Sequence, residues 1–108
     1  MDIRVSNTPN MIIGLTDENG NNIDLSLVEK VIVSFRVGNT MILTKTYPNE
    51  MTTTEEGLLL KFTQQDTIKF NNADDAEYDV KIKYKTGDVV SSDIYTISIK
   101  QQVNEEVV

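Results

Sequence analysis

The alternating run at residues 77–85, EYDVKIKYK, constrains the fold more than any other stretch of this chain. Apolar and charged side chains alternate in it, with Tyr78, Val80, Ile82 and Tyr84 set against Asp79, Lys81, Lys83 and Lys85. Because successive side chains of a strand point to opposite faces, this pattern predicts a half-buried strand. Residues 92–100, SDIYTISIK, alternate in the same way, so we expect the two runs to pair as an antiparallel hairpin across the turn at Gly87.

Short strand patterns also precede this hairpin. They lie at residues 11–15, 31–37, 41–47 and 58–62. The polar and acidic stretch 49–57 indicates a surface loop, and Thr63 followed by Asp66 is a capping pattern that predicts one short helical turn. About seven strands at intervals of roughly 8–12 residues predict an all-β fold, an antiparallel β-sandwich, with an open barrel as the alternative.

The chain is short enough to form one domain. Its 108 residues match the usual length of about 100–200 residues per domain. Residues 1–9 are expected to form an arm or a short edge strand, because Pro9 lacks the N–H that a central strand needs. Residues 101–108 are expected either to fray or to form an arm that orders against a neighbour.

Composition excludes several classes of function. The net charge of −7 and the pI near 4.4 argue against a nucleic-acid partner, since phosphate binding depends on clustered Lys and Arg. The chain has no Cys and no His, which removes thiolate nucleophiles, disulfides and the usual zinc ligands. No apolar run approaches the roughly 18 residues of a membrane span, and the N-terminus lacks a signal-peptide pattern. We therefore expect synthesis in a cytoplasm, no membrane partner and no cofactor.

Carboxylates are the remaining candidates for chemistry. Glu55 with Glu56 and Asp74 with Asp75 are pairs of the kind that glycosidases use, but both lie in polar stretches without an aromatic side chain to raise a pKa. Solvated loop charge is the favoured interpretation, so no catalytic residue is predicted. An enzyme is the least favoured class.

A calcium site is also weighed and set aside. Residues 17–24, DENGNNID, offer several oxygen ligands, but Asn22 and Val28 stand where an EF-hand loop needs Gly and Glu. A turn is the favoured interpretation. Asp74 and Asp75 beside Asn71 and Asn72 are an equally weak calcium candidate, so no metal ligand is predicted.

Exposed aromatic rings would indicate glycan binding, and the chain has no Trp. Tyr78, Tyr84 and Tyr95 fall on core-facing positions, which leaves Tyr47 as the one ring expected on the surface. The lysines at 81, 83 and 85 could meet an acidic partner, but a solvated strand face is the favoured interpretation.

Two stretches carry a resemblance to a known family. Residues 58–70, LLLKFTQQDTIKF, and 77–99, EYDVKIKYKTGDVVSSDIYTISI, resemble small immunoglobulin-like domains of tailed-bacteriophage structural proteins, including the N-terminal domains of upper-baseplate proteins. The matching residues are Thr63, Asp66, Thr67, Phe70, Gly87, Ser92 and Asp93. Residues 15–37 are similar in their order of strand, turn and second strand.

The resemblance implies an immunoglobulin-like sandwich and a non-enzymatic role. The expected function is that of a phage virion component, an accessory or decoration protein docking on the capsid or tail-baseplate surface. Its expected partners are other virion proteins and copies of itself, and its expected location is the virion after synthesis in the host cytoplasm. The alternative is a cell-surface glycan-binding module that uses Tyr47 and the 49–57 loop.

Overall fold

The computed structural model describes residues 2–17 and 19–101. The predicted C-terminal arm therefore lies outside the described residues except for Gln101. In chain order the elements are β1 (Asp2–Arg4), β2 (Asn10–Ile13), η1 (Leu25–Leu27), β3 (Val28–Val37), β4 (Thr40–Tyr47), β5 (Met51–Thr54), β6 (Gly57–Lys61), α1 (Gln64–Ile68), β7 (Asp75–Tyr84), β8 (Val89–Ser91) and β9 (Tyr95–Lys100). The predicted all-β class is confirmed.

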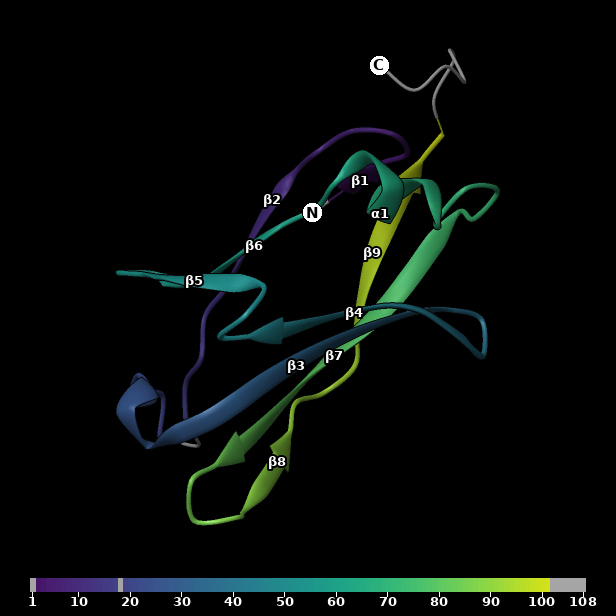
Figure 1. Cartoon of the computed structure of the whole chain (residues 1–108). Coiled ribbons are helices and arrows are strands. Elements are labelled where there is room, and N and C mark those ends of the chain that lie inside the picture. Colours follow the sequence, from purple (N-terminus) through teal and green to yellow (C-terminus); the bar gives the residue numbers. More distant parts are fainter. Residues whose placement is uncertain (1, 18, 102–108) are drawn as a thin grey trace.

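The strands form two sheets (Figure 1). The larger sheet is six-stranded, with the order β1-β9-β7-β3-β4 and β8 beside β7, and the smaller has the order β2-β6-β5. Every pair is antiparallel except β1 with β9, which run parallel with Ile3 opposite Ile99. The result is a β-sandwich-like fold in which one sheet is mixed. Residues 2–4 thus form an edge strand, and Ile3 is fully buried.

The core lies between the sheets and is centred on Phe35 of β3. Its ring packs edge-on against Phe62, with centroids 5.4 Å apart, and against Phe70 at 6.0 Å. Alternation places Val31, Val33 and Phe35 inward along β3, all without solvent exposure. Burial of these rings and branched chains is the main term that holds the sheets together, at about 1.5–3 kcal/mol per side chain.

The helical turn forms where the capping pattern predicts it. Thr63 is the N-cap of α1, and its hydroxyl accepts the N–H of Asp66 at 3.1 Å. The Asp66 carboxylate in return accepts the N–H of Thr63 at 2.8 Å, which completes a capping box. Phe70, just beyond this turn, is fully buried at the end of the sandwich.

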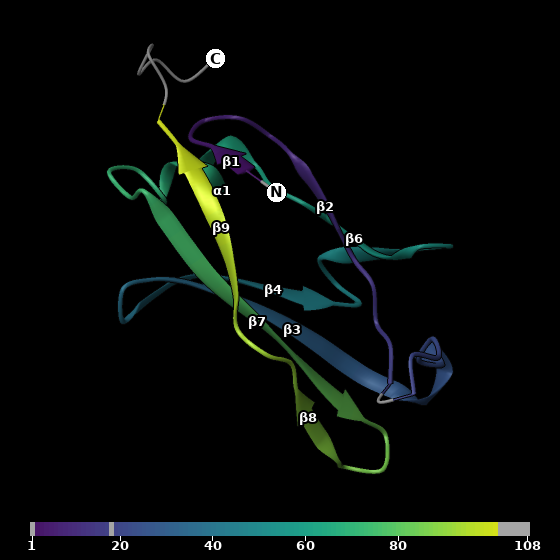
Figure 2. The same ribbon diagram turned by 180° about the vertical axis from the view of Figure 1, so that it is seen from behind.

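The predicted closing hairpin differs in its connection. The turn after β7 leads into β8, which pairs with Lys81–Lys83, and only then does the chain reach β9, which pairs with Asp75–Tyr78. The chain passes from β8 to β9 at Ser92, which is held against β7. Its N–H donates to the Val80 carbonyl and its hydroxyl accepts the Val80 N–H. Figure 2 shows β8 and β9 following one another along one edge of β7.

The prediction of a surface loop at residues 49–57 is wrong. Met51–Thr54 forms β5, which pairs with β6 across a turn at Glu55 and Glu56. Met51 is the buried residue of this strand, and the threonines that follow provide β-branched side chains at a sheet edge. A single inward apolar residue is too weak a pattern to predict a strand.

Candidate functional site

A groove opens between the sheets on the side where β2 faces β8 and β9. Its volume is about 650 Å³.

Apolar side chains from both sheets line the groove, together with polar groups such as Ser91, Ser92 and Asp93. Tyr78, Val80, Ile82 and Tyr84 come from the inward face of β7, and Ile12, Ile13, Leu15 and Ile23 come from β2 and the segment after it. Ile12, Val90 and Tyr95 are about half exposed, at 47%, 53% and 47%. A concave apolar surface of this kind is typical of a site that another molecule covers.

Tyr78 and Tyr95 lie side by side at one end of the groove. Their ring centroids are 5.3 Å apart with an interplanar angle of 32°. Burial raises the pKa of the Tyr78 hydroxyl above its usual 10.0, and the neighbouring Tyr95 adds to the rise. The Tyr78 hydroxyl is therefore a neutral donor and acceptor at the wall of the groove.

The prediction that Tyr47 is the exposed tyrosine is wrong. Tyr47 packs against the core and is half-buried, whereas Tyr95 is the ring that reaches solvent. Tyr95 does face the inner side of its sheet, as its alternation predicts, but its side chain is about half exposed. Coverage by a facing sheet is a tertiary property that alternation along one strand does not encode.

The candidate carboxylates lie apart from the groove floor and from one another. Glu55 and Glu56 form the turn between β5 and β6, while Asp74 and Asp75 lie at the start of β7. Within residues 2–17 and 19–101, no group of three or more acidic side chains is arranged to hold a metal ion.

The calcium-like loop uses its oxygens for turns. One Asp17 carboxylate oxygen accepts the N–H groups of Asn19 and Asn21 at 2.9 and 3.0 Å. Asp24 caps η1 and accepts both the hydroxyl and the N–H of Ser26, which lowers the pKa of its carboxyl below 3.8. A turn, the favoured interpretation, is what the structure contains.

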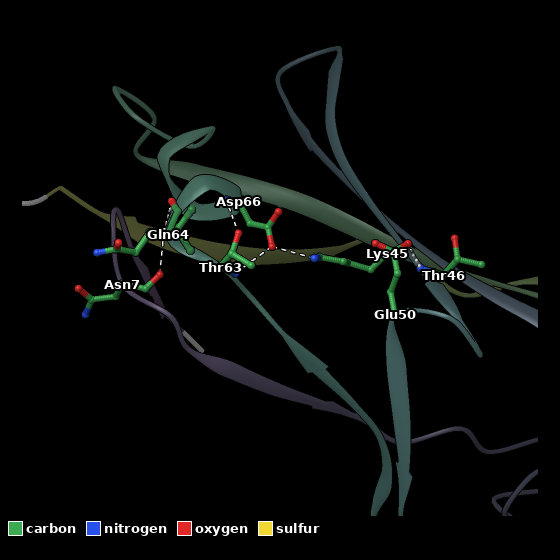
Figure 3. A network of polar contacts seen from close by, with 8 residues as sticks. Asn7, Lys45, Thr46, Glu50, Thr63, Gln64 and Asp66 are labelled. Carbon is green, nitrogen blue, oxygen red and sulfur yellow. Dashed lines mark hydrogen bonds and ion pairs between the residues drawn. The ribbon is translucent and has the colours of Figure 1, made fainter. Parts of the chain in front are cut away.

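A buried polar cluster lies at the end of the sandwich, where Lys45 of β4 meets Asp66 of α1 (Figure 3). Lys45 Nζ lies 2.7 Å from Asp66 Oδ2, and the two side chains are only 11% and 12% exposed. Burial by itself raises the pKa of Asp66, but hydrogen bonds from Lys45 and Thr63 outweigh it and the pKa is lowered from 3.8. The Thr67 hydroxyl donates to the Asn7 carbonyl at 2.8 Å, joining α1 to the N-terminal segment.

The residues on which the resemblance rests have structural roles here. Thr63 and Asp66 cap α1, Phe70 fills the core, and the chain passes from β8 to β9 at Ser92.

Of the lysines at 81, 83 and 85, Lys83 pairs with Glu29 at 3.2 Å on the solvent face. The groove was missed because its residues are scattered over four segments, each of which is an ordinary strand pattern on its own.

Across the described residues, no helix has the length and apolar character required to cross a membrane. Comparison of the chain with family models, with curated proteins and with solved structures gives no match.

Proposed function

We propose that this chain is a non-enzymatic structural component of a phage virion, an accessory protein that docks on the capsid or tail-baseplate surface through the groove between its sheets. The observation that carries the proposal is the groove of about 650 Å³, whose lining includes exposed apolar side chains. Apolar side chains such as Val90 and Tyr95 are half exposed there, and covering them in an assembly removes that surface from water.

The resemblance in the order of turns and strands is the reason to propose a virion role. The residues on which it rests include Thr63 and Asp66, which cap α1, and Ser92, where the chain passes from β8 to β9. The alternative of a glycan-binding module has less support. Tyr47 is half-buried, and much of 49–57 is paired as β5 instead of forming an open loop.

Immunogold electron microscopy on purified phage particles from a lysate of the source tests the proposal. We expect label on the particles, over heads for capsid decoration or at tail tips for baseplate docking. Label confined to the soluble fraction would overturn it.

A pair of variants links the location to the groove. Val90→Asp places a charge on the groove, whereas Met41→Asp places the same charge at a residue that is also exposed but lies outside it. We expect Val90→Asp to be depleted from particles and Met41→Asp to be retained. Equal incorporation of both would exclude the groove as the docking surface.

A further inference from the structure

We propose that the outer edge of β2 and the adjoining groove take up one extended strand of a partner protein, apolar in its centre and basic at its ends. This inference rests on the proposed docking function and gives it a surface and a partner chemistry. Strand addition to an open sheet edge is a general mode of recognition, in which backbone bonds supply affinity and side-chain pockets supply specificity.

The alternation of hydrogen bonds between β2 and β6 identifies the backbone groups of β2 that face away from β6. The N–H of Phe62 donates to the carbonyl of Pro9 at 3.0 Å, one step before Asn10 pairs with Lys61. Hydrogen-bonded and non-hydrogen-bonded pairs alternate along an antiparallel ladder, so Met11 and Ile13 bond to β6. The N–H and C=O of Asn10 and Ile12 therefore point to the outer edge.

That edge has no strand beside it in the part of the chain that the structure describes. The smaller sheet has the order β2-β6-β5, and β1, the only strand before β2, pairs with β9 of the larger sheet. The backbone groups of Asn10 and Ile12 are thus a ready template for an added strand.

The groove lies beside the outer edge of β2 and can receive the side chains of a strand added there. The four residues of β2 span about 13 Å at roughly 3.3 Å per residue. An added strand in register would point every second side chain into the groove, whose β7 wall is formed by Tyr78, Val80 and Ile82. An extended, alternating segment fills such a groove, whereas a compact ligand would leave the backbone groups of β2 unused.

Charge selects among extended segments. The charged residues among the described groove lining are Asp17 and Asp93, both acidic, and the whole chain carries −7. Basic residues at the ends of the incoming strand would meet them, and electrostatic complementarity of this kind favours correct partners over wrong ones. A second copy fits less well, since its residues 101–108 include Glu105 and Glu106.

Isothermal titration with a defined probe tests the proposal. The probe is a short peptide of alternating valine and threonine with two lysines at each end. Ile12→Pro removes the N–H at the outer edge without removing a bond to β6, and Thr53→Pro does the same at the outer edge of β5, where Thr53 pairs with Leu58 without hydrogen bonds. We expect Ile12→Pro to weaken binding about tenfold or more.

Controls separate the backbone from the side chain. Ile12→Val keeps the N–H, and Thr53→Pro lies across the sheet, so both are expected to bind the probe as the unaltered protein does. If Ile12→Pro does not fold, hydrogen exchange of the unaltered protein replaces it, and the amides of Asn10 and Ile12 should gain protection when the probe is added. No such gain would overturn the proposal.

Each remaining outcome has one meaning. Absence of probe binding, or equal losses in Ile12→Pro and Thr53→Pro, overturns strand addition at β2. Equal binding of a glutamate-flanked peptide overturns the basic partner, and tighter binding of a peptide with the sequence of 101–108 makes a second copy the occupant. Particles that carry the protein while no peptide binds defeat this inference alone, whereas peptide binding with bare particles defeats only the virion proposal.

Discussion

Lys45 of β4 and Asp66 of α1 form a buried ion pair that joins the edge of the larger sheet to the helical turn at the end of the sandwich, with Nζ and Oδ2 2.7 Å apart. The same carboxylate accepts the N–H of Thr63 and so caps α1. One side chain therefore both starts the helical turn and fixes its position on the sheet (Figure 3).

Lys45→Met is expected to lower the free energy of unfolding by about 3 kcal/mol, because it leaves the Asp66 carboxylate buried without its cation. Urea denaturation followed by circular dichroism measures the loss. Lys83→Met is the matched control, since Lys83 pairs with Glu29 at 3.2 Å but the two side chains are 41% and 53% exposed. Lys83→Met should lower the free energy of unfolding by less than about 1 kcal/mol. Equal losses would contradict a stabilising role for the buried pair.

Acid should weaken the fold through Asp66. Its folded pKa lies below 3.8, so the folded protein binds fewer protons here than the unfolded chain does. The contribution of Asp66 is therefore fully present above the unfolded value and is lost as the pH falls through the lowered folded pKa. We expect Asp66→Asn to be less stable at neutral pH but to show a shallower fall in urea midpoint on acidification. Parallel pH profiles for the two proteins would rule out this linkage.

Local patterns predicted the elements whose signal lies in a single segment. Residues 77–85 alternate strictly and form most of β7, and Thr63 with Asp66 forms the predicted cap. β5 was missed because Met51 alone points inward. Propensity and periodicity act within a few residues, so they find strong segments and pass over a short edge strand.

The groove could not be predicted from any one segment. Its walls belong to different sheets. Alternation likewise places Tyr95 opposite Tyr78 on one face, but it does not predict that Tyr95 is about half exposed. The crossing at Ser92 is likewise set by its bonds to Val80 on another strand.

Amide hydrogen exchange should alternate along β2 in the free protein. Met11 and Ile13 donate to β6 and are expected to exchange slowly, while Asn10 and Ile12 face the outer edge and are expected to exchange near the rate of an unprotected amide. Residue-resolved NMR exchange measures the contrast. Slow exchange at Ile12 would show that its N–H already has a partner, and the edge would then not be open.

Gly57 leaves no room for a side chain in the smaller sheet. It has a φ of +143°, and a Cβ there would overlap the backbone carbonyl of Ile13 on the neighbouring strand. Gly57→Ala should therefore cost more than about 3 kcal/mol, because backbone strain and a clash with backbone atoms add together. Gly38→Ala is the control, since Gly38 has a φ of +58° and an added methyl group would meet no atom within 4 Å, so strain alone should cost about 1 kcal/mol. Thermal unfolding compares the two variants. Equal losses would mean that β2 moves aside, and the β2 edge would then be too compliant to act as a preformed template.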